Sequence, residues 1–99
     1  MSRDSPRAAR LGDMSTGHDA CVPVPIITAS PDVFINGLQA ARVSDSFAVH
    51  GCVIHPPHSD VIAAGSATVF VNGLPAARKG DPVIIGGVIA EGSDNVWIG

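Results

Sequence analysis

Short apolar runs alternate with polar turn residues along this chain, and the alternation recurs. Residues 33–35 and 69–71 are β-branched and aromatic runs, followed by Asn36-Gly37 and Asn72-Gly73. Asn and Gly tolerate the positive φ angles that a two-residue type I′ turn requires, so each pattern predicts a tight β-hairpin. No segment carries apolar residues at helical spacing over three turns, so we expect no long helix.

The two hairpin patterns belong to one repeated unit. Residues 33–45 match residues 69–81 position by position; the returning half of the unit recurs at residues 6–13 and its outgoing half at residues 95–99. The chain is therefore three copies of one unit, with the third split between the termini. One copy cannot bury its apolar face alone. We predict a single, compact, all-β domain over residues 1–99, cone-like with pseudo-threefold symmetry, with its connecting loops at one end and its hairpin turns away from them.

Several polar residues recur at the same place in each copy. We expect the repeated arginines to pair with repeat acids or to cap turn carbonyls, with binding of a partner's carboxylate as the lesser alternative. We expect the repeated aspartates to form turns after their strands, and each repeated serine to open the next strand. The arginines are Arg10, Arg42 and Arg78, the aspartates Asp13, Asp45 and Asp81, and the serines Ser30, Ser66 and Ser93. In the strand-like runs both alternating sets of residues are apolar. Either the core is filled from two sides, or a partner covers one face.

Composition and charge exclude some classes of function. A net charge of −3 with six Lys and Arg argues against nucleic-acid binding, which needs surplus cations. No apolar run approaches the ~18 residues of a membrane span. No apolar segment follows the polar N-terminus, so we expect no signal peptide, synthesis in the cytoplasm and another route for any export.

All four histidines and both cysteines lie in two of the three connecting loops. His18 and His50 each follow their repeat aspartate by five residues, and Gly86 stands at that place in the third copy. Imidazole and thiolate are the ligands that zinc prefers, so three histidines and one cysteine predict a structural zinc site. The first loop carries His18 and Cys21, and the second carries His50, Cys52, His55 and His58.

Other interpretations of these loops remain open. The histidines could be solvated loop residues. The two cysteines could form a disulfide, although a chain without a signal peptide starts in a reducing compartment, which favours thiols or metal binding. Asp19 and Asp60 lie nearby, but loop aspartates are usually turn formers, so we expect no catalytic base and no enzymatic activity.

The repeat ends carry a recognisable signature. Residues 75–78 read Pro-Ala-Ala-Arg, with variants at residues 7–10 and 39–42, and together with the Asn-Gly strands the chain resembles the PAAR-repeat family over about residues 7–99. This resemblance implies a cone with one structural zinc near its apex, bound by three histidines and one cysteine. It also implies that the base sits on the trimeric β-helical VgrG spike of a type VI secretion system, or on a phage-tail spike. Family members sharpen the spike for membrane piercing and can carry effectors.

Carried onto this chain, the resemblance implies His18, His50, Cys52 and His58 as the zinc ligands. Members often place a cysteine in the third loop, where this chain has Ile85. The sulfur ligand must therefore come from elsewhere, and Cys21 or His55 could replace Cys52.

The expected function is a structural spike tip, monomeric itself, with one chain per spike trimer. Because the last strand ends at Gly99, we expect no fused toxin, and any effector would bind non-covalently and leave the cell with the spike. Two competing interpretations are a small zinc-dependent hydrolase, which needs an open coordination position and a pocket, and a redox module, which needs a reactive cysteine.

Overall fold

The chain folds into short antiparallel hairpins joined by irregular segments. The computed structural model describes residues 5–18, 21–52 and 55–99, with residues 50–52 and 55–58 described by their backbone alone. The six strands are β1 (Phe34–Ile35), β2 (Leu38–Gln39), β3 (His50–Cys52), β4 (His55–His58), β5 (Phe70–Val71) and β6 (Leu74–Pro75). They pair as β1–β2, β3–β4 and β5–β6. Among the described residues, no helix is long and apolar enough to cross a membrane.

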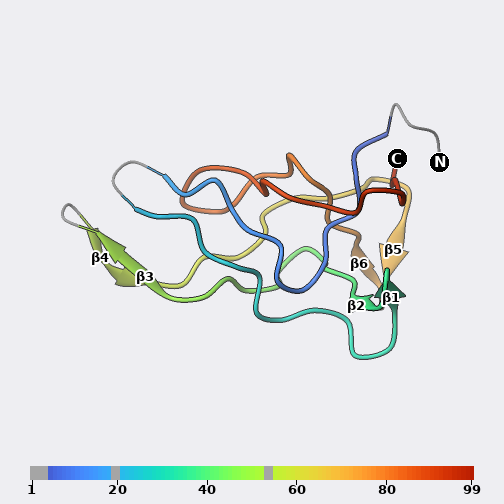
Figure 1. Cartoon of the computed structure of the whole chain (residues 1–99), viewed down its shortest axis with the longest axis horizontal. Helices are drawn as coiled ribbons and strands as arrows, with labels where there is room; N and C mark the ends of the chain where they lie inside the picture. Colours follow the sequence, from blue (N-terminus) through green and yellow to red (C-terminus); the bar gives the residue numbers. More distant parts are fainter. Residues whose placement is uncertain (1–4, 19–20, 53–54) are drawn as a thin grey trace.

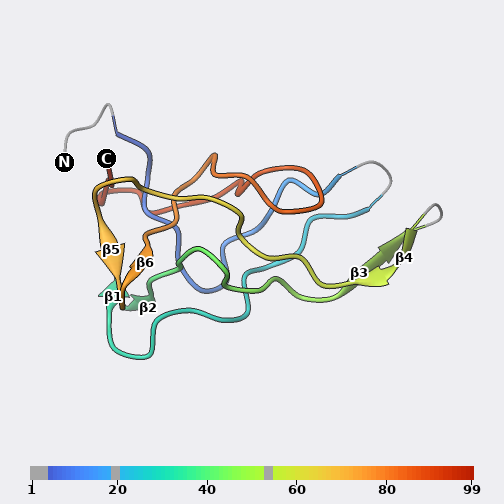
Figure 2. The same ribbon diagram turned by 180° about the vertical axis from the view of Figure 1, so that it is seen from behind.

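The molecule is elongated, with extents of 40 × 27 × 22 Å. The β3–β4 hairpin lies at one end of the long axis, while β1–β2, β5–β6 and the C-terminus lie at the other (Figures 1 and 2). The segments on either side of residues 19–20 extend toward β3–β4, as does the segment around residues 82–88. We call the two ends the loop end and the hairpin end. The predicted separation of connecting loops from hairpin turns is confirmed.

Both Asn-Gly turns have the backbone that the sequence predicts. The φ angles are 54° and 77° at Asn36 and Gly37, and 53° and 78° at Asn72 and Gly73. Positive φ at both central residues is the type I′ geometry, which matches the right-handed twist of the flanking strands. The strands are shorter than the apolar runs. In the third copy, the run at residues 96–98 forms one isolated bridge, between Arg7 and Trp97, instead of a strand.

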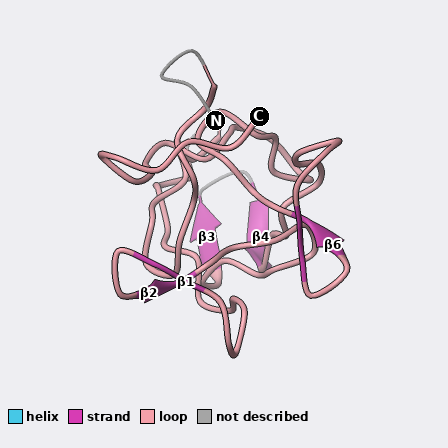
Figure 3. Cartoon of the chain, turned by 90° about the vertical axis from the view of Figure 1, so that its right-hand side faces the viewer, coloured by secondary structure: helices cyan, strands magenta, loops and turns pink. Residues whose placement is uncertain are grey.

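A ring of backbone hydrogen bonds joins the three copies. The amide of Ala41 donates to the carbonyl of Ala9, that of Ala77 to Ala41, and that of Ala9 to Ala77, each at 3.0 Å. These three alanines are at most 1% exposed. A methyl side chain is small enough for three backbones to approach this closely, which explains why Ala-Ala recurs in every copy. Figure 3 looks along the long axis, around which the copies are arranged.

The repeated polar side chains make the same bonds in each copy. The arginine Nε lies 3.1, 2.9 and 3.1 Å from the aspartate in the pairs Arg10–Asp13, Arg42–Asp45 and Arg78–Asp81. The predicted pairing is confirmed. The serine hydroxyl accepts the amide of the residue three positions on at 2.9 Å in each of the pairs Ser30–Val33, Ser66–Val69 and Ser93–Val96. The serines therefore fix the bend that opens each apolar run.

The buried core holds one phenylalanine. Phe47 is 0% exposed and packs with the equivalent isoleucines Ile26, Ile62 and Ile89. By contrast, Phe34 and Phe70 on the hairpins are 57% and 56% exposed. Their strand neighbours pack inward instead, in a second buried cluster that contains Ala8, Ala40 and Ala76. The two alternating sets therefore face opposite ways, and the chain itself leaves the phenylalanine set uncovered.

Candidate metal centre

His18 is held at the loop end by a tight backbone arrangement. The amide of Cys21 donates to the His18 carbonyl at 2.7 Å, and the amide of His18 donates back at 3.3 Å. The turn begins at Gly17, whose φ of +74° favours glycine, and a Cβ there would lie 2.5 Å from the Cys21 carbonyl oxygen. Glycine is therefore required immediately before the histidine, and the turn fixes where the imidazole starts.

The His18 side chain is almost fully enclosed. It is 8% exposed, and a Cβ built on Gly86 would lie 3.1 Å from its Cβ and 3.4 Å from its Cγ. The sequence repeat places Gly86 where the other copies have histidine. The third copy thus has no side chain at this position, and the His18 side chain lies in the space that remains.

Asp60 lies beside this imidazole. Its side chain is 2% exposed, and its Oδ2 is 3.7 Å from His18 Nε2. From the sequence we expected only the usual turn-forming role of a loop aspartate here and did not predict that the carboxylate is buried. Asp19, which received the same interpretation, lies outside the described residues.

The repeat explains why Asp60 points inward. The amide of Phe47 donates to the Asp60 carbonyl at 2.9 Å, as the amide of Ser15 does to Val24. Asp60 and Val24 thus occupy equivalent positions, and Val24 is a core residue that is 7% exposed. Asp60 therefore places a carboxylate at a position that an apolar core residue occupies in the first copy. Aligning the copies around this position would have found it from sequence.

The remaining predicted ligands lie on a hairpin that the sequence analysis treated as a loop. Strands β3 and β4 pair antiparallel, with His50 opposite His58 and Cys52 opposite His55, and with an irregularity between His50 and Cys52. The backbone therefore brings His50 and His58 to one register position. The side chains of these four residues lie outside the described part of the structure.

Cys21 differs from the expectation of a thiol. It is 5% exposed and disulfide-bonded, so in this structure it offers no thiolate to a metal. The chain's other cysteine is Cys52. Ile85, which stands where family members often have cysteine, is 50% exposed.

The donors described here fit part of a zinc site. No three His, Cys, Asp or Glu side chains gather within the described residues, so a metal beside His18 would need further ligands from outside that set. The nearest candidates by topology are those of β3–β4. An enclosed imidazole, a buried carboxylate and a pair of histidines in register match the nitrogen and oxygen donors that zinc accepts.

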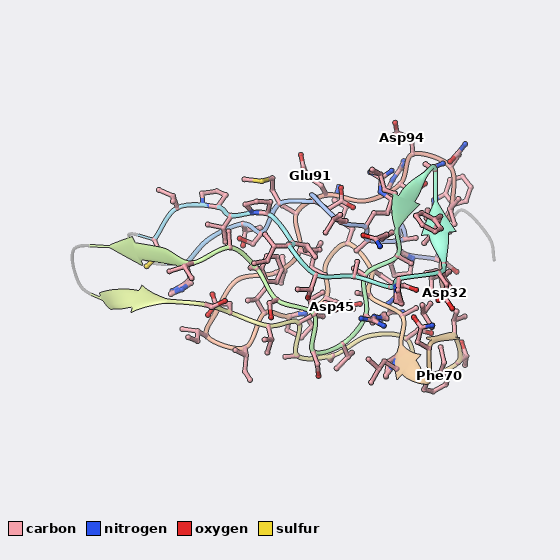
Figure 4. The ribbon with its side chains drawn as sticks, turned by 90° about the horizontal axis from the view of Figure 1, so that it is seen from below. Asp32, Asp45, Phe70, Glu91 and Asp94 are labelled. Atoms are coloured by element: carbon pink, nitrogen blue, oxygen red, sulfur yellow. The ribbon has the colours of Figure 1, made fainter. Side chains whose placement is uncertain are left out.

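The hairpin end offers a different kind of surface. We call the exposed apolar residues there the hairpin-end surface; they are Val33, Phe34, Leu38 and Phe70, between 37% and 57% exposed. Figure 4 shows Phe70 at the end of the molecule opposite β3–β4. The enclosed histidine and this apolar surface therefore lie at opposite ends of the long axis.

Comparison with protein families agrees with this arrangement of repeats. The family described as PAAR motif matches residues 1–56 and, in an overlapping match, residues 16–91. The chain belongs to the PAAR-motif family. A search of curated proteins found no match. PAAR proteins are structural spike-tip proteins, so family membership supports a type VI spike-tip role in general terms for this PAAR protein.

Proposed function

We propose that this PAAR protein caps the trimeric VgrG-type spike of a type VI secretion system, with its hairpin-end surface on the spike and its loop end pointing away. The observation that carries the proposal is the exposure of Phe34 and Phe70 at equivalent positions of two copies. Large apolar side chains in an exposed cluster mark a surface that a partner covers.

The repeated hydrogen bonds support a match to a trimer. The alanine ring and the three equivalent Arg–Asp pairs relate the copies to one another in the same way, which favours a pseudo-threefold cone. A trimeric β-helix ends in open strand edges, which invite uncontrolled pairing unless they are covered. One cone with three similar units would cover all three edges, so we expect one monomeric chain per spike trimer.

The proposal includes one structural zinc at the loop end, held by His18, His50 and His58. The fourth ligand would be His55 in the disulfide-bonded chain, and Cys52 or His55 in the reduced chain. Zinc when bound would link the first loop to the β3–β4 hairpin and stiffen the end that meets the target membrane. A zinc with four protein ligands has no open coordination position, so the proposal includes no enzymatic activity. In this proposal the protein leaves the cell with the spike and can carry effectors. We expect about one zinc per chain by elemental analysis of protein purified without added metal.

Native mass spectrometry with a VgrG-type trimer from the same source tests the capping model. We expect one chain per trimer, with weak salt dependence, because apolar burial is insensitive to ionic strength. Replacing both Phe34 and Phe70 by Ala should abolish the complex. The control is Ile84→Ala, since Ile84 is 62% exposed but lies in the segment that extends toward the loop end.

Three outcomes would contradict capping. They are a three-to-three complex, a complex that dissociates in moderate salt, and a loss of binding in Ile84→Ala as large as in the double phenylalanine variant.

A further inference from the structure

We propose that a charged cleft on one side of this protein binds a protein segment in which acidic and basic side chains lie next to each other. The cleft has a volume of about 410 Å³, and only Ala90 and Gly92 in its lining are uncharged. Its charged lining residues are Arg7, Arg10, Asp13, Lys79, Glu91 and Asp94. Neither the proposed zinc centre nor the hairpin-end surface includes any of them.

The repeat places equivalent residues at each of the three junctions between copies. One backbone hydrogen bond, 2.8 or 2.9 Å long, marks the junctions; its amide donor and carbonyl acceptor are Lys79 and Arg7, Leu11 and Gln39, and Val43 and Pro75. Counting from the repeat serines gives two more sets of equivalent residues, which are Glu91, Thr28 and Ala64, and Asp94, Pro31 and Ala67. Four positions of the cleft can therefore be compared between the junctions.

Charge is concentrated at one of these junctions. All the compared positions are charged there, as Arg7, Lys79, Glu91 and Asp94, and none is charged at the other two junctions. The Arg10–Asp13 pair, by contrast, recurs at every junction as part of the repeat. Outside the repeated pairs, the only other Lys, Arg, Asp or Glu residues in the described part of the chain are Asp32 and Asp60. The fold forms two junctions without these charges, which indicates that they have a role other than folding.

Two of the four charged side chains are oriented by one bond each. Arg7 Nη1 donates to the Ser93 carbonyl at 3.1 Å, and the guanidinium carbon lies 5.9 Å from the centroid of the Trp97 ring. Glu91 Oε1 accepts the amide of Met14 at 2.9 Å. Within the described residues, Arg7 Nη2 and Glu91 Oε2 have no hydrogen-bond partner. These side chains are therefore held in place with donor and acceptor atoms left for a ligand.

The other two charged side chains are less engaged. The ammonium group of Lys79 makes no hydrogen bond or ion pair with the described part of the chain, and the residue is exposed. The Asp94 side chain is fully exposed, and its one described contact is with Arg7 Nη1 at 3.9 Å. Exposed charges of this kind contribute little to the free energy of unfolding. Both are therefore available to a partner at little cost to the fold.

The balance of charge determines the class of ligand. The lining holds three cations and three carboxylates. A nucleic acid needs surplus cations, which the carboxylates cancel here. A metal ion would meet the cations, and no three His, Cys, Asp or Glu side chains gather anywhere in the described residues. An apolar ligand would remove these charges from water without pairing them. A protein segment with both signs can pair an acid with Lys79 and a base with Asp94, so charge complementarity makes its binding specific.

The cleft lies to one side of the surface proposed to meet the spike. Figure 4 shows Glu91 between the two ends of the molecule and Asp94 on the same side, with Phe70 on the opposite side. A segment bound there leaves the hairpin-end surface open. Because one junction of three is charged, each chain binds one such segment. The consequence for the spike rests on the proposed function: with one capping chain per trimer, a threefold spike carries one partner protein at its tip.

The experiment titrates the full chain with three synthetic peptides of equal length, blocked at both ends: alternating Glu and Lys, all Glu, and all Lys. Backbone amide shifts in two-dimensional NMR spectra at low salt give the affinity and locate the peptide. The variants are Lys79→Leu and Glu91→Thr, singly and together, because they copy Leu11 and Thr28 of an equivalent junction. There Thr28 accepts an amide as Glu91 does, so Glu91→Thr keeps this bond.

We expect the mixed peptide to bind at least about fivefold more tightly than either single-sign peptide, with shifts at the cleft. An exposed ion pair changes affinity by up to about fivefold, so the double variant should lose about tenfold. The control Asp32→Thr, which copies Thr68 and removes a charge outside the cleft, should bind as wild type does. Binding should disappear in about 1 M salt, where the Debye length is about 3 Å. The melting temperatures of the cleft variants should stay within about 2 °C of wild type, which shows that lost binding is not unfolding.

Each contrary result overturns a stated part of the proposal. A single-sign peptide that binds as tightly as the mixed one, or wild-type affinity in the double variant, overturns the mixed-charge cleft. Shifts confined to the hairpin-end surface do the same. Loss of peptide binding in the complex with a VgrG-type trimer overturns the separate partner, because the cleft then belongs to the spike interface. If no complex with the trimer forms, the proposed capping fails and the peptide result stands.

Discussion

Phe47 offers a direct test of how much core packing contributes to the free energy of unfolding of this small protein. It is the aromatic residue of the buried core, 0% exposed and in contact with the three equivalent isoleucines. Phe34 is the same residue type but 57% exposed. The substitutions Phe47→Ala and Phe34→Ala therefore delete the same atoms from two environments, and their comparison cancels effects on the unfolded chain.

The expected magnitudes follow from burial. Removing a fully buried phenylalanine costs about 3–5 kcal/mol, as transfer free energy plus a cavity. A domain of this size has a free energy of unfolding of about 5–15 kcal/mol, so Phe47→Ala removes a large fraction of it. At roughly 4 °C or more per kcal/mol, the melting temperature should fall by at least about 12 °C. For Phe34→Ala we expect a loss of under about 1 kcal/mol, since most surface substitutions have small effects.

Thermal and urea unfolding of both variants, followed by circular dichroism, measure this difference. Each variant is compared with and without a chelator, because bound metal adds its own stabilisation to every variant. The reasoning is refuted if the two variants lose equal stability, or if Phe34→Ala is the more damaging.

Two further predictions concern hydrogen-bonded aspartates, one repeated in every copy and one not. Asp45 accepts hydrogen bonds from the Arg42 amide at 2.7 Å, from Arg42 Nε at 2.9 Å and from Thr28 at 3.0 Å. Asp45→Asn should therefore cost about 2–3 kcal/mol in urea unfolding, whereas exposed Asp94→Asn should change it by under about 0.5 kcal/mol; equal losses would contradict the repeat pairing. The pKa of Asp32 is lowered by hydrogen bonds from Asn72 and Ser30. A lowered folded-state pKa means that this stability is present above the unfolded value of about 3.9 and is lost as pH falls through the folded value. Asp32→Asn should flatten the decline in stability below about pH 4, and an unchanged acid limb would refute the assignment.

The sequence determines the repeated parts of this fold because their signals are local. Asn36-Gly37 and Asn72-Gly73 specify a turn type by φ alone, and the Arg–Asp pairs span three residues. The β3–β4 hairpin was not predicted, because it lacks such local signals. The two residues between its strands are Val53 and Ile54, which are not typical turn formers, and Pro56 and Pro57 within β4 remove amide donors and argue against a strand.

The candidate site could be predicted only in part. The equivalence of His18 and His50 is visible in the repeat, and so is the glycine that replaces them at position 86. The burial of Asp60 was not predicted, because a single aspartate in a loop is usually a turn former. Aligning it with Val24, which stands at the same distance before its repeat serine, would have indicated that it faces inward. Whether Cys21 is a thiol or half of a disulfide depends on distances between loops, which spacing along the chain does not contain.

The alanine ring has a consequence for how the protein is made. The isolated hairpins can form within microseconds. The backbone of Ala9, however, is hydrogen-bonded to Ala41 and Ala77, and the amide of Ala8 to the carbonyl of Val96. Contacts between such distant segments slow folding. At about 5–20 residues per second, a ribosome needs roughly 4–17 s to synthesise the stretch between them. During that time the first Ala-Ala-Arg segment leaves the ribosome without the segments that its backbone pairs with. We therefore expect chaperones to bind the nascent chain until its last copy has been synthesised.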